Sequence, residues 1–513
     1  MKVNQLKMGV LLSYLQMALS IIIGLVYTPV MLRLLGQSEY GLYNTVSSTV
    51  AILSLLSLGF NSGYIRYYAR YKKEDDRASI NKLNGLFLII FTVIGVVAFL
   101  CGWFLSENLT LVFADGLTEA EYGTARILMW LLTVNLAISF PASVFSNIIS
   151  ANERFVFLKL LGAAKTVLGP LVTLPLLLAG YGSVAMATIS LTISCIADII
   201  FVLYTVFVLK NRFVFRGFEK GLFKSLFVYT AFIALNLVVD QINLNIDKFL
   251  LGRFCGTATV AVYSVGFSLY NYYSMMSTAV SGVYTPRIHK QVEAGEGDTA
   301  RNAGLTELFV KVGRVQYLIL ALVATGLIFF GRQFIGLWAG EGYESAYYVV
   351  LLLAVPAIVP LTQNVGIQIQ RALNKHQFRS IVYTGMAFVN LGLTIFLAPR
   401  YGAVGAAFGT AISLLLANGL VMNIYYHKKC GINILAFWKN ILRVSVGLIP
   451  PAAVGILLTL FFPMNTVWRL LLGILIYTLI YAASMWLVGV SQYERDAIAV
   501  PLKRIFRHGK HTR

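Results

Sequence analysis

Residues 83–105 read LNGLFLIIFTVIGVVAFLCGWFL, an uninterrupted run without a charged side chain. About 20 such residues, wound as a helix, cross the roughly 30 Å hydrocarbon core of a bilayer, whereas the strands of a membrane barrel alternate apolar and polar residues. Comparable runs recur from Met8 to Val490. The sequence therefore predicts an all-α membrane protein.

The composition agrees with a chain whose main solvent is lipid. Hydrophobic residues make up 58% of the 513 residues and charged residues 12%, against about a quarter charged in soluble domains, and the mean hydropathy is +0.76. The four cysteines and five histidines show no ligand spacing, so neither a disulfide nor a metal site is predicted. The first apolar run is too long for a signal-peptide core and is kept as a span.

The apolar runs predict about fourteen spans, an even number that places both termini on one side of the membrane. Their expected positions are 8–32, 41–63, 83–105, 124–148, 158–179, 183–208, 226–247, 257–281, 313–336, 347–370, 380–398, 404–426, 443–462 and 467–490.

The distribution of Lys and Arg predicts which side is the cytoplasm. Only seven of the 41 Lys and Arg fall at the ends opposite the termini, namely Arg33, Arg126, Lys248, Arg253, Arg332, Arg400 and Arg469. The positive-inside rule therefore assigns both termini to the cytoplasm. The net charge of +20 is dispersed over many short loops, so no nucleic-acid partner is predicted. The basic tail 491–513 is read as a cytoplasmic flank that can contact membrane lipids.

An internal repeat appears when the chain is compared with itself at an offset of 220 residues. Tyr181-Gly182-Ser183-Val184 matches Tyr401-Gly402-Ala403-Val404. Leu34-Leu35-Gly36 matches Leu250-Leu251-Gly252 at an offset of 216, which implies a four-residue insertion after the second copy. We read the glycines of these matched pairs as tight turns on the exterior side. Spans 1–6 and 7–12 thus form two parallel copies, with a central cavity expected between them. The predicted organisation is a six-helix bundle over 1–215, a second over 216–430, two additional helices over 431–490 and the tail.

Span 7 carries the least expected polar residues of the chain, Asn236, Asp240, Asn243 and Asp247. In a continuous α-helix their spacing places all four on one stripe, which cannot face lipid. Such a stripe is either hydrogen-bonding glue between helices or a coupling site. Asp198, in the middle of span 6, leaves the same two readings open. Its partner must come from another helix, unless burial keeps it protonated.

Spans 2 and 8 carry tyrosine and hydroxyl stripes that include Tyr43 and Asn61 in span 2 and Tyr263 and Tyr270 in span 8. They either line a wet cavity that binds sugar or pack against other helices. Three cations near or inside the spans, Arg33, Lys165 and Lys248, could meet a phosphate, although long side chains also reach water by snorkelling.

Several of these stretches resemble bacterial polysaccharide and O-antigen flippases of the multidrug/oligosaccharidyl-lipid/polysaccharide exporter superfamily. They are Arg33-Leu-Leu-Gly-Gln-Ser-Glu-Tyr-Gly-Leu-Tyr43, Asn245-Ile-Asp-Lys-Phe-Leu-Leu-Gly252, Ala261-Val-Tyr-Ser264 and the Tyr-Gly-x-Val-x-x-Ala turns. The resemblance implies two six-helix bundles in the bacterial inner membrane and an undecaprenyl-diphosphate-linked oligosaccharide as substrate. It also implies a cationic cavity and, as in several members, coupling to H+ or Na+ without a cofactor.

Two other functions remain open at this stage. A multidrug exporter of the same superfamily would use Asp198 and Asp240 to bind organic cations. A membrane polysaccharide polymerase or ligase would need a substantial exterior loop, which this chain lacks by the predicted topology. We therefore expect a transporter, not an enzyme. No pattern in the sequence indicates whether the protein is a monomer or an oligomer.

Overall fold

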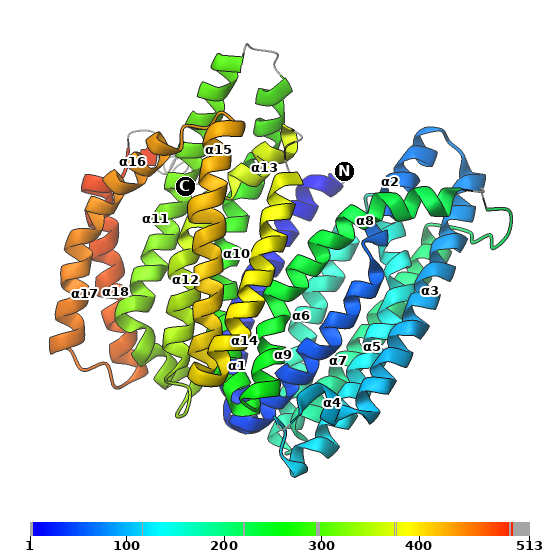
Figure 1. Cartoon of the computed structure of the whole chain (residues 1–513), viewed down its shortest axis with the longest axis horizontal. Helices are drawn as coiled ribbons and strands as arrows, with labels where there is room; N and C mark the ends of the chain where they lie inside the picture. Colours follow the sequence, from blue (N-terminus) through cyan, green and yellow to red (C-terminus); the bar gives the residue numbers. More distant parts are fainter. Residues whose placement is uncertain are drawn as a thin grey trace, which may run out of the picture. The chain divides into compact units, whose positions relative to one another are not determined.

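The computed structural model describes residues 4–114, 116–218, 221–293, 298–373, 375, 377–491 and 494–495. These residues form helices and their connections and contain no β-strand, which confirms the predicted all-α membrane fold (Figure 1). The helices are α1 Gln5–Ile52, α2 Phe60–Lys73, α3 Arg77–Glu107, α4 Leu109–Phe113, α5 Glu119–Ala151, α6 Phe155–Leu178, α7 Gly182–Leu203, α8 Leu222–Gln241, α9 Asp247–Phe254, α10 Thr257–Glu293, α11 Asp298–Ala339, α12 Ala346–Thr362, α13 Val365–Ala372, α14 Gln377–Leu414, α15 Asn423–Lys429, α16 Ile434–Ser445, α17 Ile449–Phe461 and α18 Val467–Ser484.

Among the described residues, nine helical stretches are long and apolar enough to cross a membrane, or ten if the bent pair of α12 and α13 counts as one span. The chain is therefore a multi-pass membrane protein. Two of the nine, Met8–Lys73 and Gln377–Lys429, are 66 and 53 residues long, more than a single crossing requires. The count of fourteen spans stays a prediction.

Glycines in the left-handed region make sharp turns within or between these long stretches. Gly36 interrupts α1 with φ 76°, and Gly402 interrupts α14 with φ 56°. Gly256, between α9 and α10, has φ 82°. Only glycine adopts such angles without strain from a Cβ. The tight turns predicted at Gly36 and Gly402 are thus confirmed.

The other predicted turn lies four residues later than expected. Gly252 is inside α9, and the left-handed glycine after that helix is Gly256. Gly36 and Gly256 are separated by the same 220 residues that separate Gly182, with φ 63°, from Gly402. The matching turns therefore need no four-residue insertion, and the offset of 216 is wrong for this turn.

The backbone contacts divide the chain into two units, which we describe separately. Unit 1 consists of Met1–Val265 with Ala387–Gly409. In it, α3 packs on α5, α1 on α6, and α5 on α7. Its buried core includes an aromatic cluster in which Tyr64 and Phe91 both lie close to Phe87.

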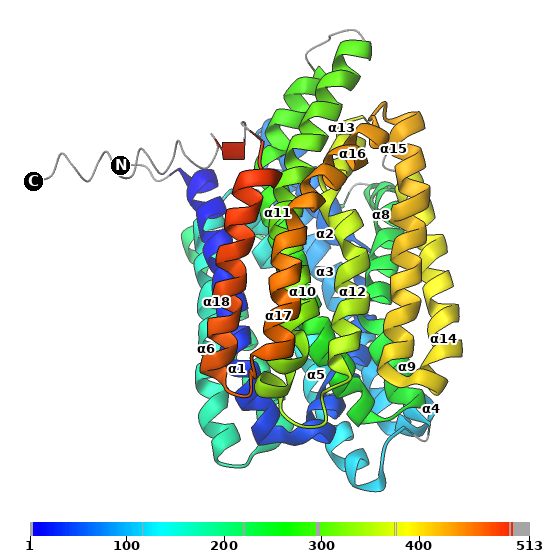
Figure 2. The same ribbon diagram turned by 90° about the vertical axis from the view of Figure 1, so that its left-hand side faces the viewer.

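Unit 2 consists of Gly266–Met386 with Thr410–Arg513. Here α11 packs against α12, α16, α17 and α18, and α17 and α18 lie side by side (Figure 2). The core includes Phe309, Tyr426, Phe437 and Tyr477. The two C-terminal helices are thus an integral part of this core. The predicted division of the chain at residues 215 and 430 stays a prediction.

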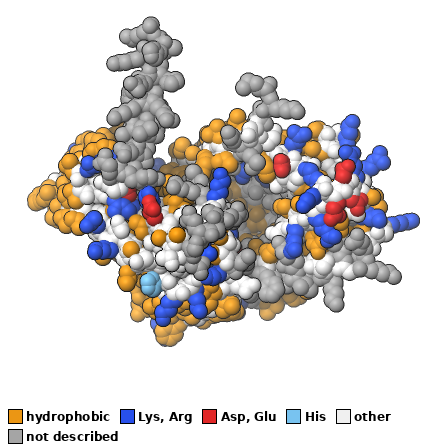
Figure 3. Space-filling model, turned by 90° about the horizontal axis from the view of Figure 1, so that it is seen from above, with side chains coloured by type: hydrophobic (Ala, Val, Ile, Leu, Met, Phe, Trp, Pro, Cys, Tyr) orange, Lys and Arg blue, Asp and Glu red, His pale blue; other side chains and the backbone are white. Residues whose placement is uncertain are grey.

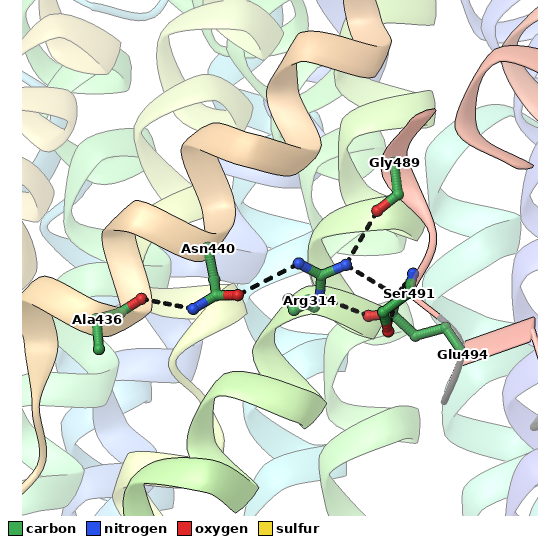
Figure 4. A network of polar contacts seen from close by, with 6 residues as sticks. All are labelled: Arg314, Ala436, Asn440, Gly489, Ser491 and Glu494. Carbon is green, nitrogen blue, oxygen red and sulfur yellow. Dashed lines mark hydrogen bonds and ion pairs between the residues drawn. The ribbon is translucent and has the colours of Figure 1, made fainter. Parts of the chain in front are cut away.

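A buried ion pair fastens the segment after α18 to α11 within unit 2 (Figure 4). The Arg314 guanidinium donates from Nε to Oε1 of Glu494 at 2.7 Å and from Nη2 to Oε2 at 2.9 Å. Nη2 also donates to the Gly489 carbonyl at 2.9 Å. Of the predicted tail, 491–513, the structure describes only Ser491, Glu494 and Arg495.

Candidate functional site, a polar cavity inside unit 1

Three membrane-spanning helices of unit 1 surround a cavity of about 280 Å³. Its polar lining consists of Ser47 on α1, Asn135 and Ser139 on α5, and Ser194 on α7. Hydroxyl and amide groups at membrane depth are expensive unless they find partners, and they often mark a substrate or ion path. Because the four side chains converge from three helices, the cavity is a candidate binding site.

A lysine and an aspartate lie beside this cavity. Lys165 on α6 donates from Nζ to the Ser194 hydroxyl at 3.3 Å, so it reaches the cavity wall through a lining residue. Asp198 lies four residues after Ser194 on α7 and interacts electrostatically with Lys165. Asp198 is thus both half-buried and within electrostatic reach of a cation on another helix, and the two readings of the sequence, a partner from another helix or protonation by burial, both stay predictions. Lys165 is half-buried and thus does not reach out freely to solvent.

Asp198 also faces a second pocket, of about 420 Å³, between α5 and α7. Apart from Asp198 and Cys195, the residues that line it are apolar, and they include Pro141 and Phe145. An intramembrane carboxyl group between a cation and an apolar wall can change its protonation state with its surroundings. The pair Lys165 and Asp198 is therefore the part of the site most able to couple charge to movement.

The predicted second span, 41–63, is broken in its middle. Helix α1 ends at Ile52, a 3₁₀ turn covers Leu53–Ser57, and Leu58 and Gly59 have φ 44° and 73° before α2 begins. A Cβ at Gly59 would lie 2.6 Å from Cγ2 of Ile233 on α8. The close approach of this break to α8 therefore requires glycine at position 59. Discontinuous helices at membrane depth are a recurring device of transporter sites.

The break separates the two polar residues predicted on span 2. Tyr43 is half-buried on α1 and packs against the core that includes Val46 and Leu128. Asn61 lies on α2, where its Oδ1 accepts hydrogen bonds from Nδ2 of Asn147 at 2.7 Å and from Ser143 at 3.4 Å. Asn61 thus bonds α2 to α5, and its role in binding substrate stays a prediction.

The predicted polar stripe of span 7 is interrupted by a π-helical segment, Ile242–Ile246, between α8 and α9. Such a segment adds about one residue to a turn and rotates the residues after it by about 100° relative to an α-helix. Asp240 is accordingly exposed, whereas Asp247 is only 2% exposed. The prediction of one continuous stripe is therefore wrong between these two residues. Asn243 is half-buried in the π segment, and the side chain of Asn236 lies outside the described part of the chain.

Asp247 forms a buried hydrogen-bonded group with residues of two other helices. Its Oδ2 accepts from the Tyr263 hydroxyl at 2.7 Å, and its Oδ1 accepts from Thr394 at 2.9 Å. Tyr263 is also buried, and Asp247 is the partner that its hydroxyl needs away from water. Next to this group, Lys248 is half-buried on α9, while Arg33 is exposed on α1.

Tyr270, the remaining predicted cavity tyrosine, belongs to unit 2. It is half-buried, and its ring centroid lies 5.8 Å from that of Phe267 on the same helix. It also packs against the small core that contains Tyr273. Tyr270 is not among the residues that line the polar cavity of unit 1, and its role in binding substrate stays a prediction.

Sequence reasoning missed several polar residues that the structure brings together. Gln241 donates to Ser54 at 2.9 Å and accepts from Asn245 at 2.6 Å, which ties the π segment to the broken span. Ser194 and Asn135 were also missed, because a lone serine or asparagine in an apolar run gives no periodic signal. In the described residues, no group of three or more His, Cys, Asp or Glu is placed to hold a metal ion.

Comparisons with known proteins identify the family and the fold. The profile of the polysaccharide biosynthesis protein family matches residues 6–291. A Shigella flexneri protein named "Putative O-antigen transporter" is 20% identical over 411 residues, which cover 78% of this chain and 92% of that protein. The Bacillus subtilis "Uncharacterized membrane protein EpsK" is 20% identical over 439 residues, which cover 83% of this chain and 83% of that protein.

Two solved structures share the fold. The lipid II flippase MurJ, in an inward closed conformation, superposes with a TM-score of 0.71 at 17% identity, over 96% of this chain and 99% of that one. An inward-facing multidrug resistance transporter of the MATE family superposes with a TM-score of 0.60 at 16% identity, over 81% of this chain and 99% of that one. By its matching residues and its fold, this chain belongs to the polysaccharide biosynthesis protein family of membrane proteins.

Proposed function

We propose that this protein is a flippase that moves an undecaprenyl-diphosphate-linked oligosaccharide from the cytoplasmic to the outer leaflet of the bacterial inner membrane by alternating access. The family match and the name of the Shigella flexneri relative support a lipid-linked sugar as the substrate class. The fold shared with the flippase MurJ is compatible with it.

The observation that carries the proposal is Lys165, a cation within a membrane span whose ammonium group bonds to a serine of a polar cavity. A diphosphate that enters a region of low dielectric must be met by fixed positive charge and hydrogen-bond donors. The Ser47 hydroxyl and the Asn135 amide add donors suited to phosphate or sugar oxygens, whereas the Ser139 hydroxyl donates to the Leu136 carbonyl at 2.7 Å and is left to accept. At about 280 Å³ the cavity holds only part of the substrate, so we assign it to the head group.

We further propose that a proton or sodium gradient drives the movement. Asp198, Asp240 and Asp247 are the carboxylates of unit 1 that the sequence places within spans. Of these, Asp198 shares the electrostatic environment of Lys165. Protonation of Asp198 would release the Lys165 ammonium for the substrate phosphate, whereas ionisation would compete with the phosphate. The predicted cytoplasmic placement of both termini belongs to the same proposal.

An organic cation is a poorer match for this cavity. The Lys165 ammonium repels cationic drugs. It also offsets the negative charge of Asp198, the carboxylate that would otherwise attract them. The similarity to the multidrug transporter concerns the fold at 16% identity. The sign of the charge at the cavity therefore favours an anionic substrate.

The test uses a strain that lacks this gene and is complemented with variants. We expect Lys165→Gln to lower surface polysaccharide strongly and Lys165→Arg to retain much of it, because arginine keeps the charge. Lys159→Gln, on the same helix, is the matched control and should behave as wild type. Equal surface polysaccharide from Lys165→Gln and Lys159→Gln, at equal protein level, would refute the assignment.

A further inference from the structure

A further pocket of unit 1, of about 550 Å³, is lined by residues that lie outside the spans predicted from the sequence. It forms where α2 ends, α3 begins and α5 ends, and the segment 209–212 closes it. Four cations line it, Lys72, Arg77, Lys210 and Arg212, against the single carboxylate of Asp75. The view from above shows many Lys and Arg side chains on this face of the molecule (Figure 3).

The cations of this pocket differ from their neighbours in lacking carboxylate partners. On the same helix, Arg70 pairs with Glu74 at 3.3 Å. Within the described ranges, none of the four pocket cations has an ion pair. Lys72 donates to the Ala151 carbonyl at 3.3 Å and lies 5.9 Å from the centre of the Tyr68 ring. With four cations against the one carboxylate of Asp75, the lining of the pocket keeps an excess of positive charge.

The segment that carries Lys210 and Arg212 is held in place by a side chain and a backbone carbonyl of α3. The Asn84 side chain donates to the Arg212 carbonyl at 3.2 Å, and the Val214 amide donates to the Asn81 carbonyl at 3.0 Å. Gly85 allows this approach, because a Cβ there would collide with the Val214 backbone. In a freely moving loop, electrostatic repulsion would drive Lys210 and Arg212 away from the other cations of the pocket. The hydrogen bonds to α3 prevent this movement.

Neutral donors complete the pocket. Asn152 donates to the Tyr68 hydroxyl at 2.8 Å, and Asn81 and Asn211 contribute further amide groups to the lining. Guanidinium, ammonium and amide groups that converge on one hollow are the donors with which proteins bind phosphate oxygens. The volume lies in the range of ordinary small-ligand pockets.

We propose that this pocket binds a phosphate-bearing anion at the face predicted to be cytoplasmic, either a soluble phosphate compound or the head group of an anionic lipid. The site is separate from the cavity beside Lys165. Its occupancy does not depend on the proposed flippase function.

The experiment measures binding to the full-length protein in phosphatidylcholine nanodiscs, with pyrophosphate as the probe, by isothermal titration calorimetry. One lost charge-assisted hydrogen bond corresponds to a roughly tenfold weaker Kd. We expect Arg212→Gln to weaken pyrophosphate binding about tenfold and Arg77→Gln with Lys210→Gln about 100-fold. Arg70→Gln, which removes a paired cation outside the pocket, should change the Kd less than about twofold.

A second arm distinguishes the two sources of phosphate. Replacing part of the phosphatidylcholine by phosphatidylglycerol should raise the unfolding temperature of the wild type more than that of Arg77→Gln with Lys210→Gln if the ligand is a lipid head group. Pyrophosphate binding that depends on Arg77, Lys210 and Arg212, with equal phosphatidylglycerol stabilisation of the wild type and the double variant, identifies a soluble ligand. All variants must match the unfolding temperature of the wild type in pure phosphatidylcholine, and the single variant replaces any double variant that does not.

Two results would overturn the inference. One is pyrophosphate affinity and phosphatidylglycerol stabilisation that are the same in the wild type and in the pocket variants. The other is the absence of both effects in the wild type. Neither result would bear on the transport of lipid-linked sugar, which is measured without these probes.

Discussion

The ion pair between Arg314 and Glu494 provides the strongest single test of how unit 2 is held together. Their side chains are only 8% and 3% exposed. The carboxylate of Glu494 accepts two hydrogen bonds from Arg314, and its Oε2 also accepts from the Ser491 amide at 2.6 Å and the Ser491 hydroxyl at 2.7 Å. Glu494→Ala leaves a buried guanidinium with the Gly489 carbonyl and a 3.5 Å contact to Asn440.

Removing one partner of a buried pair costs about 3–5 kcal/mol. The pair borders a pocket of about 490 Å³, which can admit water to solvate the remaining charge, so we expect a value near the lower end. A loss of about 3 kcal/mol lowers the unfolding temperature by about 6–12 °C in a unit of this size. Thermal unfolding of the purified protein in detergent measures the shift.

Two further variants sharpen this prediction. Glu74→Ala removes the partner of Arg70 in an exposed pair and should cost less than about 1 kcal/mol. Arg314→Met combined with Glu494→Leu should be more stable than Glu494→Ala, because no charge stays buried. Equal small shifts for Glu494→Ala and Glu74→Ala would refute the reasoning.

The same pair predicts a dependence of stability on pH. Burial alone would raise the pKa of Glu494, but the hydrogen bonds from Arg314 and Ser491 outweigh it, so the pKa lies below its usual value. A lowered folded pKa adds stability above the unfolded pKa of about 4.3, and this stability is lost as the pH falls through the folded pKa. The difference in unfolding free energy between the wild type and Glu494→Ala should therefore become smaller at acid pH.

The remaining predictions concern packing, topology and transport. Gly85→Ala should destabilise the protein by about 1–3 kcal/mol, because its Cβ would meet the Val214 backbone, whereas Gly123→Ala, with open space around it, should not; thermal unfolding compares them. In a variant without the four native cysteines, an impermeant thiol reagent applied from outside should label a cysteine at Glu119 and not one at Lys73, because of the distribution of Lys and Arg; the reverse pattern would invert the topology. Asp240→Asn should lower transport at normal expression, since an amide neither carries charge nor exchanges a proton; wild-type transport would make Asp240 a structural residue. Arg33→Gln with Lys248→Gln should abolish surface polysaccharide while each single change does less, and normal polysaccharide in the double variant would remove both from the substrate path.

The sequence was sufficient for the membrane class, the helical fold and several turns. Hydropathy alone identifies runs such as 83–105, and glycines at 36 and 402 are recognisable because the chain must reverse there. The cost of an isolated carboxyl group in a span also marked Asp198 as a residue that needs either a partner on another helix or protonation by burial. The nearness of Lys165 to Asp198 depends on the packing of α6 on α7 and could not be read from the sequence.

Other features leave no readable trace in one sequence. Residues 53–59, LSLLSLG, have the hydropathy of an intact helix, and the break there depends on the approach of Ile233 to Gly59. The π segment that turns Asp247 away from Asp240 has no periodic signature, because it shifts the register by only about one residue. Arg314 and Glu494 are 180 residues apart, so only the fold brings them together.

Reconstitution of the purified protein in proteoliposomes tests the central claim most directly. Wild-type protein should move a fluorescent undecaprenyl-diphosphate oligosaccharide between leaflets, as read by its exposure to a membrane-impermeant quencher, and should leave a cationic dye in place. Lys165→Gln should slow the movement and Lys159→Gln should not. Transport of the dye without movement of the lipid-linked sugar would contradict the account.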